Sequence, residues 1–410
     1  PTSYFTLSSG DGTKEVYFKV KDVASNESST VEASIILDMT PPSSPALQTP
    51  ASGSVISNSV LTLTWEAATD NLSDIASYEI NLDGTLATRD ATTSYLTPTL
   101  LNGIHTWEVK ARDGAGNWGS YSAAWTFMVD TSEASAPILV YPANGSAINS
   151  SQPVMSWEAA VDPLSGIASY EIRIDDTIVT QDATVTYVPP LSLSESIHSW
   201  EVRAKNGAGL WGAFSSLFTF TVKTGTPEVA SVLLKDKYSG NTIYTRNNLV
   251  SVEAIGVTGT PSQMLLSESP SFEGGVWIDY AMKSEYEISS SEGTKRVYYK
   301  LRDIASNESS PVSATIVLDT TEPSIPTLES PAQGEEITSL NPTFSWQPAT
   351  DNLSGIASYE IKIDEVPTTT GTTPAYTPET ALIVGGHSWE VRAKDRAQNW
   401  GGFSSTQTFS

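Results

Sequence analysis

An internal repeat limits what this chain can fold into more than any other feature. One module type, which we call A, occurs three times, and its first half reads LTWEAATDNLSDIASYEINLD at 63–83, MSWEAAVDPLSGIASYEIRID at 155–175 and FSWQPATDNLSGIASYEIKID at 344–364. Its second half reads GIHTWEVKARDGAGNWG at 103–119, SIHSWEVRAKNGAGLWG at 196–212 and GGHSWEVRAKDRAQNWG at 385–401. Self-similarity at a fixed period indicates an array of small units instead of one large domain.

A second module type, B, occurs once whole and once in part. Its end reads GTKEVYFKVKDVASNES at 12–28 and GTKRVYYKLRDIASNES at 293–309. Asp22 and Asp303 lie 281 residues apart, and so do Trp65 and Trp346, so the larger unit is B-A-A. We therefore divide the chain into the second half of a B module (1–38), two A modules (39–130 and 131–223), a whole B module (224–319) and a further A module (320–410).

The first 38 residues correspond to only half of a B module, and half a sandwich cannot bury its own apolar face. Either the parent chain is longer, or another subunit supplies the missing strands by β-strand addition. The repeat order predicts that residue 410 is followed by a second A module, resembling 131–222, and then by another B.

Apolar and polar residues alternate with period two, which is typical of half-buried strands. Tyr78, Ile80 and Leu82 fall on one face of such a strand, and Trp107 and Val109 on one face of another. Short strands separated by turn signals predict an all-β fold of tandem two-sheet sandwiches. Proline stands in each linker, at 39–45, 131–137, 224–227 and 320–326. Linkers of this kind are semi-rigid, so we expect an elongated rod.

The motifs resemble known families. In module A an early Trp is followed by a Tyr-x-Ile strand, a Gly-x-His-x-Trp-Glu-Val-x-Ala strand and an Asp-x-Ala-Gly-Asn turn, and this order resembles bacterial fibronectin-type-III-like modules. Module B resembles bacterial Ig-like repeats. The resemblance implies tandem Ig-like and fibronectin-type-III-like β-sandwiches of large secreted or cell-surface proteins. Such modules serve as spacers, adhesins or enzyme accessories, so the resemblance predicts architecture better than biochemistry.

The amino-acid composition limits which classes of partner this chain can bind. There are 47 acidic and 22 basic side chains, and the formal net charge is −25. A surface this acidic repels phosphate groups, which argues against nucleic acid and anionic membranes as partners. No run of 18 apolar residues exists, so we expect no membrane insertion in this segment. Cysteine is absent, which excludes disulfides and thiolate sites, and we expect an extracellular or cell-surface location.

The sequence carries no recognisable catalytic motif, and we predict that the chain is not an enzyme and needs no organic cofactor. The three histidines, His105, His198 and His387, all occupy one repeat position, which favours a scaffold role over catalysis. A third set of repeated tryptophans lies in a turn and is a candidate for exposed, glycan-contacting aromatics, although packing against a neighbouring loop explains it as well: Trp118, Trp211 and Trp400.

The recurring acids are the chemical signal of most interest. They stand in the loop after the Trp strand, in the Ala-Gly-Asn-type turn and at the module junctions: Asp70, Asp162 and Asp351; Asp113 and Asp395; Asp38, Asp130 and Asp319. Asn206 and Lys223 interrupt the pattern. Loops meeting at the end of a sandwich could supply oxygen ligands for Ca²⁺. The alternative is that these side chains cap turns by accepting hydrogen bonds from their own backbone.

Three functions fit these observations. The first is a structural segment of an extracellular fibre, stalk or filament, whose partners are other copies of itself or other surface proteins, joined by strand addition at the incomplete modules. The second is an adhesin repeat that binds glycans or proteins. The third is an accessory spacer region of a secreted polysaccharide-degrading enzyme.

Overall fold

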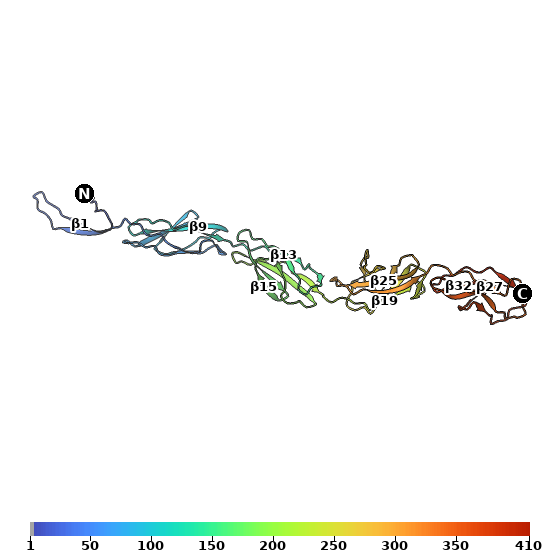
Figure 1. The fold of residues 1–410 in the computed structure, drawn as a ribbon. Helices are drawn as coiled ribbons and strands as arrows, with labels where there is room; N and C mark the ends of the chain where they lie inside the picture. Colours follow the sequence, from blue (N-terminus) through green and yellow to red (C-terminus); the bar gives the residue numbers. More distant parts are fainter. Residues whose placement is uncertain (1–3) are drawn as a thin grey trace. The chain divides into compact units, whose positions relative to one another are not determined.

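The computed structural model describes residues 4–410 and contains only β-strands and irregular segments (Figure 1). No helix in this part of the chain is long and apolar enough to cross a membrane. The chain forms two compact units. The first runs to Phe220, except for residues 147–151 and 193–196, which belong with residues 221–410 in the second.

The first unit begins with a lone hairpin. Strands β1 (Gly12–Phe18) and β2 (Val31–Leu37) pair antiparallel, with Gly12 opposite Leu37 and Phe18 opposite Val31. Residues 39–130 then form two sheets, of order β3-β5-β8 and β4-β10-β9-β6-β7. Their strands are β3 (Leu47–Thr49), β4 (Ser54–Ile56), β5 (Thr62–Trp65), β6 (Ile75–Leu82), β7 (Thr85–Asp90), β8 (Ser94–Leu96), β9 (Gly103–Asp113) and β10 (Trp125–Val129).

Residues 131–223 repeat this arrangement, with sheets of order β11-β13-β16 and β12-β18-β17-β14-β15. The strands are β11 (Ile138–Tyr141), β12 (Ser146–Ile148), β13 (Met155–Glu158), β14 (Ile167–Ile174), β15 (Thr177–Gln181), β16 (Thr186–Tyr187), β17 (Ile197–Asn206) and β18 (Phe218–Val222).

The second unit contains the whole B module and the last A module. In 224–319 the sheets are β19-β21-β24 and β20-β26-β25-β22-β23, and in 320–410 they are β27-β28-β31 and β30-β29-β32-β33. The strands are β19 (Ser231–Asp236), β20 (Tyr244–Thr245), β21 (Leu249–Ile255), β22 (Gln263–Ser267), β23 (Ile278–Asp279), β24 (Lys283–Glu287), β25 (Gly293–Arg302), β26 (Val312–Leu318), β27 (Thr327–Ser330), β28 (Phe344–Gln347), β29 (Ile356–Ile363), β30 (Val366–Thr370), β31 (Ala375–Tyr376), β32 (His387–Asp395) and β33 (Gln407–Phe409).

Modules A and B differ in sequence but share one strand order. In 39–130 and in 224–319 a three-stranded sheet faces a five-stranded sheet, and the second strand of each module pairs parallel with the last one (β4 with β10, β20 with β26). The sequence distinguished two module types, and the structure shows that they are variants of one sandwich.

The core of each A module forms around one aromatic pair. Trp65 and Tyr78 are almost fully buried and meet edge-on, with ring centroids 5.3 Å apart. The buried Ala68 N–H donates a 3.0 Å hydrogen bond to the Tyr78 hydroxyl. This satisfies the one polar atom that a buried tyrosine brings into a core. The later A modules repeat the contact with Tyr170 and Tyr359.

The two copies of the B hairpin show what covers an apolar face. In 224–319, Val297, Tyr299 and Leu301 are buried against the sheet β19-β21-β24. In the first hairpin the counterparts of Tyr299 and Leu301 are Phe18 and Val20, which are 59% and 55% exposed. The same strand pattern is therefore buried only where the opposing sheet is present.

Candidate functional site

Three carboxylates meet where the hairpin β1–β2 adjoins the first A module. Asp38 directly follows β2, Asp70 lies in the loop after β5, and Asp113 ends β9. One oxygen from each lies within 4.8 Å of the others. Asp38 and Asp113 are buried, at 6% and 1% exposure. These three predicted metal ligands, which are far apart in the sequence, are thus brought together.

The turn at the end of β9 explains part of this arrangement. Asp113 accepts hydrogen bonds from the backbone N–H groups of Gly116 (2.6 Å) and Asn117 (2.8 Å). Burial alone would raise the pKa of Asp113, but the hydrogen bonds from Asn117 and Gly116 outweigh it and lower that pKa. The Asn117 amide donates to Asp113 (2.8 Å) and to the Asp38 carbonyl oxygen (3.1 Å). The turn is therefore capped, and it is also tied to the preceding segment.

The last A module repeats the group with Asp319, Asp351 and Asp395, whose carboxylate oxygens again lie within 4.8 Å of one another. Asp319 and Asp395 have no exposed surface. Burial raises the pKa of Asp395, and the negative charges of Asp319 and Asp351 raise it further, against the hydrogen bonds from Asn399. Asn399 repeats the role of Asn117, since its amide donates to the Asp319 carbonyl oxygen at 2.8 Å.

The middle A module has a different composition at the same place. Asp130 and Asp162 meet Asn206, whose amide nitrogen lies 3.3 Å and 3.1 Å from their carboxylate oxygens. The whole B module differs again. There Lys223 lies 3.6 Å from the Asp303 carboxylate and donates a hydrogen bond to the Thr260 hydroxyl. The predicted acids are therefore brought together at every A module, but two of the four places contain a neutral or a cationic side chain.

The repeated turn tryptophans are half-buried beside cations. The Arg392 guanidinium lies 4.4 Å from the centroid of the Trp400 ring, and the Lys394 ammonium lies 5.2 Å from it. Trp211 has Arg203 and Lys205 in the same positions. Trp118 has Lys110 and Arg112. Cation–π contact accounts for the pairing of these basic strand residues with a turn tryptophan.

The repeated histidines are held by a turn aspartate, a contact that sequence reasoning missed. His387 Nδ1 lies 2.5 Å from Asp364, and its Nε2 lies 2.7 Å from the Ile383 carbonyl oxygen. His105 makes the same pair of contacts with Asp83 and Leu101. The aspartate of each pair stands in the turn after the Tyr-x-Ile strand, where all three A modules have Asp (83, 175 and 364). That shared position was the available signal.

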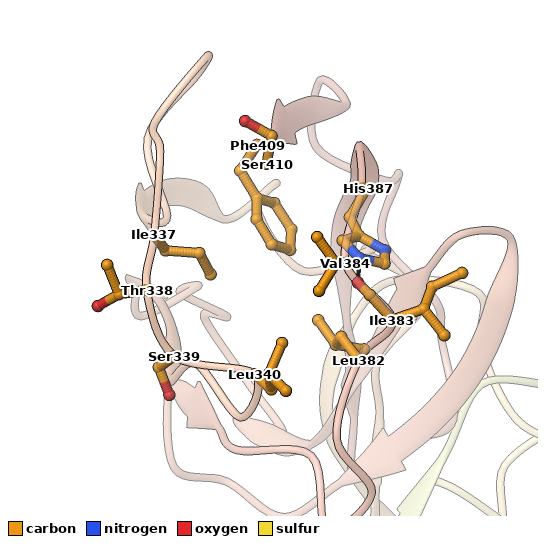
Figure 2. A pocket seen from close by; sticks show the side chains of 11 residues that line it. Ile337, Thr338, Ser339, Leu340, Leu382, Ile383, Val384, His387, Phe409 and Ser410 are labelled. Carbon is orange, nitrogen blue, oxygen red and sulfur yellow. Dashed lines mark hydrogen bonds between the residues drawn. The ribbon is translucent and has the colours of Figure 1, made fainter.

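The last A module has an apolar cavity of about 150 Å³ beside His387 (Figure 2). Its wall is made mainly by Ile337, Leu340, Leu382 and Phe409. Figure 2 shows the His387 ring at its edge, hydrogen-bonded to the Ile383 carbonyl oxygen. Because both ring nitrogens already face acceptors, we assign this histidine a structural role.

No protein-family profile matches the chain. It is 29% identical over 338 residues to endoglucanase B of Cellulomonas fimi, which covers 76% of this chain and 29% of that protein. Exoglucanase A of the same organism is 30% identical over 170 residues, 40% of this chain and 19% of that protein. Chitinase A1 of Niallia circulans is 28% identical over 221 residues, 52% of this chain and 30% of that protein. The chain thus spans less than a third of the length of each relative.

Two solved structures are similar as well. The fibronectin(III)-like modules of Clostridium thermocellum CbhA are 13% identical, with a TM-score of 0.32, over 44% of this chain and 94% of theirs. A tetra-tandem repeat from the extending region of a large adhesion protein is 16% identical, with a TM-score of 0.31, over 90% of this chain and 99% of that one. The chain is an all-β string of tandem sandwiches resembling fibronectin type III and Ig-like repeats. The relatives support a structural or spacer repeat region.

Proposed function

We propose that this chain is a non-catalytic spacer region of a secreted polysaccharide-degrading protein. The observation that carries the proposal is the pattern of similarity. Most of this chain aligns with endoglucanase B, yet it covers only 29% of that protein. The chitinase shows the same disproportion. Enzymes named for different polysaccharides thus share with this chain only a minor part of their length, as expected of an accessory region and not of a catalytic domain.

The chemistry of the repeated residues supports the same proposal. The histidines are paired with turn aspartates, the turn tryptophans lie beside cations, and most of the repeated acids accept backbone hydrogen bonds. Each of these contacts recurs at the same repeat position. A catalytic site needs a unique constellation of groups, whereas these contacts serve to build the same sandwich several times.

The gene that encodes the chain offers the direct test. Sequencing outward in the same reading frame should find a non-repeating domain of 200 or more residues with paired acidic side chains suited to glycoside cleavage. Such a domain also predicts secretion, because its polymeric substrate lies outside the cell. A frame that contains only B-A-A repeats between its start and stop codons would contradict the spacer proposal.

Self-assembly into a fibre is a second candidate, supported by the one strand order that recurs in modules A and B. Other copies of the chain, or other surface proteins, would be its partners. Light scattering coupled to size exclusion separates the two candidates. A monomer at micromolar concentration favours the spacer, and a concentration-dependent oligomer favours the fibre.

A further inference from the structure

The two three-carboxylate groups occupy a position that occurs at four places in the chain. In each, one residue directly follows the last strand of a module: Asp38, Asp130, Lys223 and Asp319. A second stands at the end of the long strand of the next module, where the turn begins: Asp113, Asn206, Asp303 and Asp395. In the A modules a third comes from the loop after the Trp strand: Asp70, Asp162 and Asp351. The four places are built from equivalent positions of the repeat, but the side chains at those positions differ in charge.

At two of these places the chain itself supplies partners for the buried carboxylates. Asn206 donates hydrogen bonds toward both Asp130 and Asp162, and the Ser165 hydroxyl donates to Asp130 at 2.5 Å. The backbone N–H groups of Ser132 and Ser165 donate to the other oxygens of Asp130 and Asp162, so both oxygens of each carboxylate have donors. At the B module the Lys223 ammonium supplies a positive charge directly, 3.6 Å from Asp303.

The other two places have no such compensation. Asp38 is 94% buried (6% exposed), and one of its carboxylate oxygens, Oδ2, has no hydrogen-bond donor. Asp70 Oδ1 in the same group, and Asp351 Oδ2 in the other, are likewise buried atoms without a donor. A buried carboxylate oxygen with no donor is unfavourable, and three like charges within 4.8 Å repel one another. Turn capping explains the bonds that Asp113 makes, but it leaves these oxygens unexplained.

We propose that the groups Asp38–Asp70–Asp113 and Asp319–Asp351–Asp395 each bind one Ca²⁺, and that the places with Asn206 and Lys223 do not. A cation would take the role that the Lys223 ammonium has at the B module. Three carboxylates offer up to six oxygens and no nitrogen or sulfur, which is the donor set of Ca²⁺ and unlike that of Zn²⁺. The third carboxylate decides occupancy, so the chain binds two ions and not four. This inference stands apart from the proposed spacer function.

Calorimetric titration of the EDTA-treated 410-residue chain with CaCl₂ tests the proposal. The expected stoichiometry is two ions per chain. Asp113→Asn and Asp395→Asn should each leave one, and the double variant none. Asparagine is the native residue at 206, so these variants should keep the fold, which circular dichroism checks. Asn206→Asp should raise the stoichiometry to three. Asp182→Asn, in an exposed turn outside the groups, is the matched control and should leave two.

Several results would overturn the proposal. They are the absence of calcium uptake, fewer than two ions per chain, and a stoichiometry that the double variant leaves unchanged. A stoichiometry of two in Asn206→Asp would contradict the deciding role of the third carboxylate. Equal binding of MgCl₂ under the same conditions would overturn the choice of calcium, because Mg²⁺ demands a tighter octahedral site.

Discussion

In each A module the linker backbone packs directly against the glycine of the Trp-Gly turn. We predict that Gly401→Ala destabilises the last A module. A methyl group at Gly401 would lie 2.6 Å from the Pro323 carbonyl oxygen and 3.6 Å from that of Ala393. Both atoms are backbone, so no flexible side chain can move away. The same contact recurs at Gly119 with Pro42 (2.5 Å) and at Gly212 with Ala134 (2.2 Å).

The cost follows from overpacking. Forcing an extra carbon into a well-packed site costs about 1–3 kcal/mol. Hydrogen exchange read by mass spectrometry on peptides from 387–410 should show a loss of protection equivalent to about that free energy. Gly371→Ala is the matched control, because a methyl group there meets nothing within 4 Å. Equal protection in the two variants would refute the reasoning that the linker carbonyl occupies this space.

Three further predictions concern the repeated contacts. Tyr78→Phe leaves the buried Ala68 N–H without its acceptor, so denaturant unfolding should report a loss of about 1–3 kcal/mol. The hydrogen bond to Asp364 raises the pKa of His387 above its usual 6.5. The contribution of the protonated His387 to the free energy of unfolding is therefore complete below pH 6.5, and it is lost as the pH rises through the raised pKa. The free energy of unfolding should therefore decline with rising pH more steeply in the parent chain than in His387→Gln. Trp400→Ala should leave retention on insoluble cellulose unchanged, since cations already lie over that ring; a clear loss of retention would revive the glycan-binding alternative.

The sequence predicted the core well because the signal is periodic and repeated. Trp107 and Val109 are fully buried where the alternation placed them, and Tyr78 is 1% exposed. Phe18 and Val20 stand two residues apart in the same kind of alternation, yet they are exposed. Period two identifies which face of a strand is apolar, but it contains no information on whether a second sheet covers that face.

The sequence predicted the candidate site only in part. It identified the acids, because they recur, but not which of them share a buried group with an oxygen lacking a donor. That distinction depends on the Asn206 amide and the Lys223 ammonium, whose partners come from loops tens of residues away. The role of Asn117, which ties the turn to the Asp38 carbonyl oxygen, was also missed. A backbone acceptor leaves no trace in the residue types.

The central proposal is that this chain supports other domains and does no chemistry itself. An assay of polysaccharide hydrolysis by the purified 410-residue chain tests it most directly. Reducing ends released from cellulose, chitin and soluble oligosaccharides would be quantified over hours at micromolar concentration. The account predicts release indistinguishable from buffer on every substrate. Sustained release that co-purifies with the chain, and that substitution of one of its carboxylates abolishes, would contradict it.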